Sequence, residues 1–187
     1  MVIDTRGLTR GAVAGGIAAG VWALQQPLDK RAFRSRYDDV ELLGRFVTRE
    51  RGGWQAPGLA LHVQNGMVFG ALYSQLAPRL PGPPAARGVQ VALAEHVALW
   101  PLGRLSDRRH PARARLPRLT GNRRAFWQAA WRHALFGALL GTLEQRLVSP
   151  APPVSPATQP PVIDLAAHSS RNGHGNIEHA LQDPRRG

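Results

Sequence analysis

Hydrophobic residues gather in four long segments, which are separated by two longer polar connections and one short proline-rich link. The segments cover residues 11–28, 57–77, 85–105 and 126–143. Each holds about the 17–25 residues that a helix needs to span a membrane. The pattern therefore predicts an all-α fold, a bundle of four transmembrane helices.

The composition changes abruptly after Leu147. Six prolines fall within residues 149–162, and a polar stretch follows them. Such a segment buries too little apolar area to offset the entropy lost on ordering. We therefore predict a four-helix membrane domain over residues 1–148 and a disordered tail over residues 149–187.

Polar and charged residues interrupt the apolar segments. They include His62, Glu95, His96, Arg132 and His133. A charge at the centre of a membrane costs roughly 2.5–3.5 kcal/mol, so a soluble bundle of buried helices stays open as an alternative. Two features favour the membrane, namely the glycine density of the segments and the tryptophans near their ends. These tryptophans are Trp22, Trp54, Trp100 and Trp127. We expect a multi-pass protein of the bacterial inner membrane.

The charge of the chain predicts an orientation in that membrane. There are 24 Lys and Arg residues against 12 Asp and Glu residues, a formal net charge of +12. Most of the basic residues lie in connections 29–55 and 104–124. Because short positive loops stay on the cytoplasmic side, we expect both connections to be cytoplasmic and both termini to be external. Arg6 and Arg10 also fit a cleaved signal over residues 1–23, and this alternative stays open.

Glycines recur four residues apart in three of the four segments. The members of these pairs are Gly11, Gly15, Gly16, Gly20, Gly66, Gly70, Gly137 and Gly141. On a helix this spacing makes a flat strip that lets a neighbouring backbone approach closely. The spacing therefore predicts tight helix–helix packing at these eight positions.

Two of the glycine strips begin with a histidine at the same spacing. His62, Gly66 and Gly70 are followed by Leu72, in the pattern that His133, Gly137 and Gly141 form with Leu143. The first and third segments share an Ala-Leu pair followed by Pro-Leu, and each precedes a long basic connection. The chain is therefore interpreted as two repeated helical hairpins.

These stretches resemble a family of uncharacterised four-helix membrane proteins from bacteria, notably actinobacteria. The resemblance lies in residues 62–72, in residues 95–102 and in residues 133–143, and it covers about residues 7–147. It implies the four-helix membrane architecture and no particular activity.

The ionisable residues of the segments are a speculative polar or ion site. The site comprises His62, Glu95, His96, Arg132 and His133. Intramembrane ionisable groups indicate an ion or proton path, and an ion pair between Glu95 and Arg132 is an equal explanation. His62, His96 and His133 would make a membrane-embedded metal site, but the chain has no metal-binding spacing. We expect no catalytic residue, no metal ion and no cofactor, and the lack of cysteine excludes a cysteine nucleophile.

The leading hypothesis is an integral membrane protein with a structural, assembly or small-scale transport role, and no enzyme. Its expected partners are the lipid bilayer and either a second copy or another membrane protein. The alternative is a basic helical protein that binds nucleic acid or anionic lipid through residues 104–124, where eight arginines face one acid, Asp107. No aromatic residue interrupts that run, so nucleic acid is not expected. Residues 29–55 contain apolar positions that suit a short amphipathic helix on a membrane surface.

Overall fold

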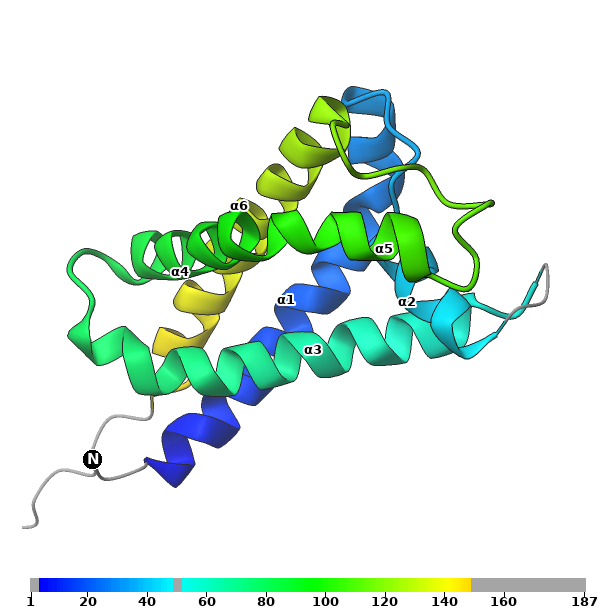
Figure 1. Ribbon diagram of the computed structural model, residues 1–187. Coiled ribbons are helices and arrows are strands. Elements are labelled where there is room, and N and C mark those ends of the chain that lie inside the picture. Colours follow the sequence, from blue (N-terminus) through cyan, green and yellow to red (C-terminus); the bar gives the residue numbers. More distant parts are fainter. Residues whose placement is uncertain (1–3, 49–51, 149–187) are drawn as a thin grey trace, which may run out of the picture. The chain divides into compact units, whose positions relative to one another are not determined.

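The computed structural model describes residues 4–48 and 52–148. Within these ranges every regular element is a helix (Figure 1). The α-helices are α1 (Thr5–Ala32), α2 (Asp39–Val47), α3 (Gln55–Leu76), α4 (Pro84–Leu99), α5 (Gly103–Arg109) and α6 (Arg123–Arg146). Two short 3₁₀ turns, η1 (Ala77–Arg79) and η2 (Trp100–Leu102), follow α3 and α4. The predicted tail over residues 149–187 lies outside the described residues.

Local features mark the end of α1 and the starts of α2 and α6. α1 runs through Pro27 and ends before Arg34, whose φ of 49° lies in the left-handed region that rarely continues a helix. α2 begins after Asp38, whose carboxylate accepts a hydrogen bond from the backbone N–H of Glu41. α6 begins after Asn122, whose side chain accepts from Ala125. These caps satisfy backbone donors that the first helical turn leaves without a partner.

The long helices pack in the order α3, α1, α6, α4, since the closely packed pairs are α1 with α3, α1 with α6, and α4 with α6. The shorter α2 lies on α3. Alanines, aromatic rings and leucine fill the main core, which includes Ala14, Ala18, Trp22, Tyr73, Phe136 and Leu140. The outer helices α3 and α4 lie in front of α1 and α6 (Figure 1). A cleft lies between α3 and α4, since residues of both helices line one cavity.

Glycines make the contact between α1 and α3. A Cβ atom at Gly11 would overlap the carbonyl oxygen of Gly70, and one at Gly15 would overlap that of Gly66. The two backbones therefore touch directly at these four glycines. Of the other predicted glycines on α1, Gly16 faces the side chain of Met67, and Gly20 has no neighbour within 4 Å.

The contact between α4 and α6 is built in the same way. A Cβ atom at Gly88 would overlap the carbonyl oxygen of Gly137, and one at Gly141 would overlap that of Pro84. Gly44 of α2 approaches Trp54 at the start of α3 as closely. Each half of the chain thus has two long helices in backbone contact, α1 with α3 and α4 with α6. A shorter helix, α2 or α5, lies between the two in the sequence.

The expected transmembrane bundle is wrong. Among residues 4–48 and 52–148, none of the helices combines the length and the apolar character needed to cross a bilayer. α1 owes its apolar stretch mainly to glycine and alanine, which carry little apolar surface, and the apolar segment 85–105 breaks after Leu99, which leaves α4 with 16 residues. This finding also contradicts the predictions that depended on the bundle. They are the four spans, the inner-membrane location, and the cytoplasmic and external sides assigned to the loops and termini.

The connection over residues 29–55 contains the predicted short amphipathic helix, but part of that helix packs on the rest of the protein. It contains α2, whose Val40 is buried and whose Gly44 packs on α3. Phe46 and Val47 on the same helix are exposed. α2 covers one end of the cleft, so this connection supplies residues to the site described next.

Candidate functional site: a histidine-lined cavity

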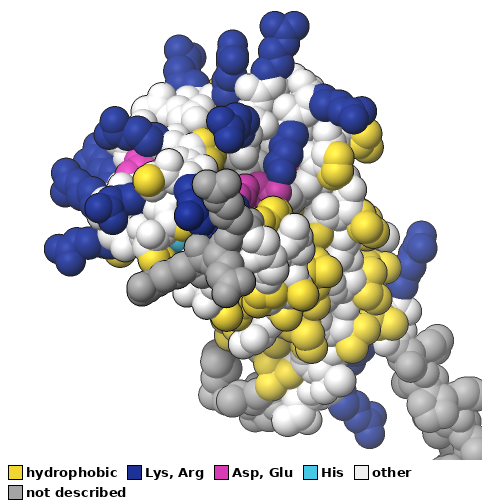
Figure 2. Space-filling view, turned by 90° about the vertical axis from the view of Figure 1, so that its right-hand side faces the viewer, with side chains coloured by type: hydrophobic (Ala, Val, Ile, Leu, Met, Phe, Trp, Pro, Cys, Tyr) yellow, Lys and Arg dark blue, Asp and Glu magenta, His cyan; other side chains and the backbone are white. Residues whose placement is uncertain are grey.

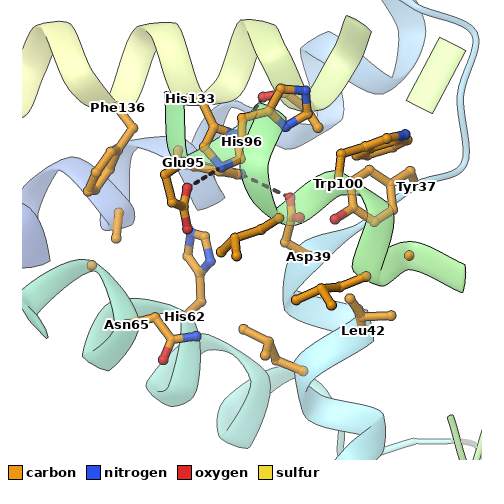
Figure 3. Close-up of a pocket in the computed structure, with 18 of the residues that line it drawn as sticks. Tyr37, Asp39, Leu42, His62, Asn65, Glu95, His96, Trp100, His133 and Phe136 are labelled. Atoms are coloured by element: carbon orange, nitrogen blue, oxygen red, sulfur yellow. Dashed lines mark hydrogen bonds and ion pairs between the residues drawn. The ribbon is translucent and has the colours of Figure 1, made fainter. Parts of the chain in front are cut away.

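A cavity of about 390 Å³ lies in the cleft between α3 and α4. α1 and α6 form its floor, and α2, η2 and α5 close one end. Its surface is mainly apolar and aromatic, with a few polar side chains (Figure 3). The aromatic lining residues are Trp22, Tyr37, Phe46, Phe69, Trp100 and Phe136. Such a cavity has the size and the lining of small-molecule sites in other proteins.

Three histidines from three helices line the cavity, and two of them pack against Trp22 of α1. The ring of Trp22 lies 5.1 Å from that of His62 on α3 and 4.8 Å from that of His133 on α6. The ring of His96 on α4 lies 4.8 Å from that of His133. The packing of α1 between α3 and α6 therefore brings together histidines that lie far apart in the sequence.

His133 and Glu95 form a close polar pair at the edge of the cavity (Figure 3). His133 Nε2 lies 3.0 Å from Glu95 Oε2, and His133 Nδ1 lies 2.7 Å from the carbonyl oxygen of Ala129. Because a carbonyl oxygen only accepts, Nδ1 carries a proton.

His62 and His96 are both uncharged at neutral pH. Burial lowers the pKa of His62 below its usual value, and burial together with the nearby His133 lowers the pKa of His96 to about 4, so both rings are neutral at pH 7.

The Nε2 atoms of His62 and His96 are buried and have no hydrogen-bond partner among the described residues. A neutral imidazole has one accepting nitrogen, so each of these rings can accept one hydrogen bond.

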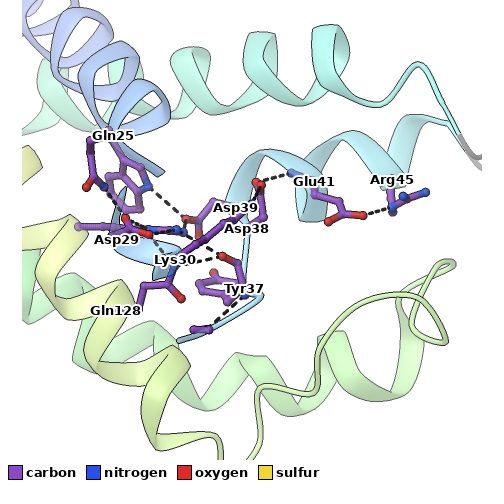
Figure 4. A network of polar contacts seen from close by, with 12 residues as sticks. Gln25, Asp29, Lys30, Tyr37, Asp38, Asp39, Glu41, Arg45 and Gln128 are labelled. Atoms are coloured by element: carbon purple, nitrogen blue, oxygen red, sulfur yellow. Dashed lines mark hydrogen bonds and ion pairs between the residues drawn. The ribbon is translucent and has the colours of Figure 1, made fainter. Parts of the chain in front are cut away.

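A buried ion-pair network supports the floor beside the histidines (Figure 4). Arg132 of α6 is fully buried, and its Nε and Nη2 donate to the two carboxylate oxygens of Asp29 at 2.6 Å each. Its Nη1 lies 2.6 Å from Asp39 Oδ2, which also accepts from Trp22 Nε1 at 3.1 Å. Gln128 donates to Asp29 at 2.7 Å. The network ties the end of α1 and the start of α2 to α6.

The network fixes the charges of its members. Burial alone would raise the pKa of Asp39, but the Arg132 guanidinium and the Tyr37 hydroxyl outweigh burial and hold that pKa below its usual value. Burial likewise would lower the pKa of Arg132, but Asp29 and Asp39 raise it. Arg132 therefore serves the packing of the helices and does not line the cavity.

The structure brings four of the five predicted polar residues to one cavity, namely His62, Glu95, His96 and His133. The considered pair of Glu95 with Arg132 is replaced by the pairs Glu95–His133 and Arg132–Asp29. In the described part of the chain, no group of three or more His, Asp or Glu side chains is placed to hold a metal ion. The three histidines therefore share a cavity without the geometry of a metal centre.

Sequence reasoning missed Trp22, Tyr37 and Asp39 as lining residues. Trp22 was interpreted as an interfacial residue, and Tyr37 and Asp39 belong to a polar connection. No local spacing marks Tyr37 or Asp39, because only the folding of the connection over the long helices brings them to the cavity.

The arginine-rich segment lies on the surface, close to the closed end of the cavity. All eight arginines between residues 104 and 124 are exposed, while His110 is buried and contacts the carbonyl oxygen of Leu42 at 3.0 Å. Asp107 accepts from the backbone N–H groups of Leu119 and Thr120. Figure 2 shows Lys and Arg side chains at the top and left of one face, with hydrophobic side chains gathered in its middle and lower part.

Comparison of the chain with protein families, with curated proteins and with solved structures finds no match. The resemblance to bacterial four-helix membrane proteins stays a prediction. The function is therefore inferred from the cavity and from the surface of this chain.

Proposed function

We propose that the protein binds a small, mainly apolar organic molecule in the histidine-lined cavity, through a hydroxyl or ammonium group on that molecule. The observation that carries the proposal is the pair of buried, unpartnered Nε2 atoms of His62 and His96 beside the Glu95 carboxylate. These three side chains offer hydrogen-bond acceptors from two facing helices. A ligand that donates hydrogen bonds complements them.

The energetics support a donor ligand. A buried acceptor without a partner costs about 1–3 kcal/mol, and a donor from a ligand removes that cost. A carboxylate or phosphate ligand would instead place its negative charge against Glu95 and two lone pairs. The apolar and aromatic walls contribute affinity through burial of the rest of the molecule.

Phenol and anisole test this proposal directly, because they differ by the methyl group that removes the donor. Titration followed by tryptophan fluorescence or calorimetry is expected to show tighter binding of phenol. His62→Phe and His96→Phe each remove one acceptor at similar volume, and each is expected to weaken phenol binding about tenfold and leave anisole nearly unchanged. Val97→Ala, at an exposed position outside the cavity, serves as the control. Equal binding of phenol and anisole to the unaltered protein would refute the proposal.

A second candidate function is the binding of single-stranded nucleic acid by the arginine-rich segment. The observation that favours it is the outer face of α6, where Arg123, Trp127 and Trp131 follow one another every fourth residue. Trp127 and Trp131 are 58% and 49% exposed. Exposed tryptophans beside arginines supply base stacking beside phosphate contacts. The expectation of no nucleic acid rested on the lack of aromatic residues within 104–124, and these two tryptophans lie just after that range.

Fluorescence anisotropy with a labelled oligouridine tests this second candidate. Trp127→Ala is expected to weaken binding about tenfold or more, in line with the loss of one stacked base. Arg146→Gln, at the other end of α6, is the control. Dextran sulfate, which has charge but no bases, should compete poorly at equal charge. If Trp127→Ala binds the oligouridine like the unaltered protein, the stacking surface does not exist.

A further inference from the structure

A second cavity continues the histidine-lined cavity along the cleft. It has a volume of about 500 Å³ and lies between α3 and α4. Asn65, Phe69 and Glu95 line both cavities. The two cavities therefore adjoin at these three side chains.

The second cavity is apolar beyond the shared residues. Val68, Leu72 and Leu76 follow one another every fourth residue along α3, and Val91 of α4 lies opposite. The three α3 side chains are 55%, 66% and 42% exposed. Large aliphatic side chains thus line an open groove that starts at the polar end of the first cavity. Because α3 rises about 1.5 Å per residue, the groove from Asn65 to Leu76 is about 16 Å long.

We propose that the ligand is an elongated amphiphile, a long-chain primary alcohol or amine. Its hydroxyl or ammonium group lies at His62, His96 and Glu95, and its alkyl chain lies in the groove along Val68 and Leu72. This inference rests on the proposed function and adds the shape and the chemical class of the ligand.

Three features of the site select this occupant. The groove and the cavity share Asn65, Phe69 and Glu95, so a chain attached to a head group in the cavity leads past these residues to the apolar side chains. The head-group end holds a carboxylate and two neutral imidazoles, which can accept from O–H or N–H donors. Glu95 stands at the junction of the two cavities, and its negative charge disfavours a fatty acid, whose carboxylate would lie beside it.

The experiment is a chain-length series on the full chain, with hexanol, octanol and decanol as probes and decanoate as the charged comparison. Affinities come from calorimetry below the aggregation limit of each probe. Each added methylene is expected to tighten binding about threefold while the groove fills. Decanoate is expected to bind at least tenfold more weakly than decanol, because its carboxylate faces Glu95 and the two lone pairs.

Two matched variants test the place of the chain. Leu72→Glu puts a charge into the groove at a residue that is two-thirds exposed, so the fold tolerates it, and Val97→Glu puts the same charge on α4 outside both cavities. Leu72→Glu is expected to abolish the dependence on chain length and leave hexanol binding unchanged. Val97→Glu is expected to behave like the unaltered protein. Circular dichroism verifies that both variants are folded.

The outcomes separate this inference from the proposed function. Binding of hexanol and decanol with equal affinity, or a chain-length dependence that survives Leu72→Glu, would overturn the inference and leave the donor site standing. Decanoate bound as tightly as decanol would overturn the assignment of the head group. If neither phenol nor hexanol binds, the proposed function itself fails.

Discussion

Arg132 is the residue on which the arrangement of helices around the cavity depends. It is fully buried and pairs with Asp29 and Asp39, which come from the end of α1 and the start of α2. Removing one partner of a buried ion pair leaves the other charge without compensation. Arg132 therefore matters for stability, and it does not line the cavity.

Substitution of Arg132 tests this role. Arg132→Met leaves the buried Asp29 and the partly buried Asp39 without their cation and is expected to lower the free energy of unfolding by about 3–5 kcal/mol, measured by urea denaturation. Combining it with Asp29→Asn removes one of the two charges and should recover part of that loss. A change of less than about 0.5 kcal/mol in Arg132→Met, the range of ordinary surface substitutions, would show that the network does not hold the helices together.

His96 predicts how stability depends on pH. Its folded pKa is about 4, below the ordinary value of 6.5, so between these two values the unfolded chain binds more protons than the folded protein. Stability is therefore full above pH 6.5 and falls as the pH drops toward 4. The slope approaches about 1.4 kcal/mol per pH unit for this residue, and His62 adds to it with the same sign.

Urea denaturation between pH 7 and pH 4.5 measures this slope. The charged groups that act on His96 are His133, Glu95 and Asp39. They are present in the unaltered protein and in His96→Phe, so the difference in slope between the two proteins is the contribution of His96. The variant is expected to lose up to about 1.4 kcal/mol per pH unit of the slope. An unchanged slope would mean that His96 titrates normally in the folded protein.

At the scale of the elements, the glycine contacts decide how closely the long helices approach. Gly11 and Gly20 lie on the same helix, but only Gly11 touches another backbone. Gly11→Ala is expected to destabilise the protein by about 1–3 kcal/mol, since the methyl group overlaps the Gly70 carbonyl oxygen and the helices must separate. Gly20→Ala is expected to be neutral or to stabilise by up to about 1 kcal/mol, because alanine favours a helix.

Thermal unfolding of the two variants decides whether the glycine contacts are close packing or composition. If Gly11→Ala and Gly20→Ala unfold at the same temperature, α1 and α3 do not meet as described. The sequence spacing singled out both residues equally, because a spacing of four does not say which side of α1 faces α3.

The elements show where local sequence suffices and where it does not. The four apolar segments form helices, but Pro101 and the 3₁₀ turn at η2 end the third one early. The spacing of glycines indicated α1, α3 and α6 as close-packed helices. It missed Gly88 on α4, because the residue four positions later, Ala92, is not a glycine. Short α5 within the arginine-rich connection has no apolar periodicity that would have marked it.

At the scale of the whole molecule, the glycine density and the tryptophans near the segment ends gave the misleading signal, because they favoured a membrane. The polar residues inside the apolar segments counted against a membrane, and the fold pairs Arg132 with Asp29 and gathers His62, His96 and His133 around one cavity. The candidate residues themselves were visible in the sequence. Their convergence was not, because it depends on α1 packing between α3 and α6 and on α2 folding over the cleft.

His62 and His96 are proposed to be neutral and to accept hydrogen bonds from a donor ligand at Nε2. Nitrogen-15 NMR of the imidazole rings tests this proposal most directly, with His62→Phe and His96→Phe assigning the signals. The account predicts that both rings at pH 7 are neutral, with the proton on Nδ1, and that phenol shifts the Nε2 signals of both while anisole leaves them in place. Protonated Nε2 atoms, or signals that phenol does not move, would contradict it.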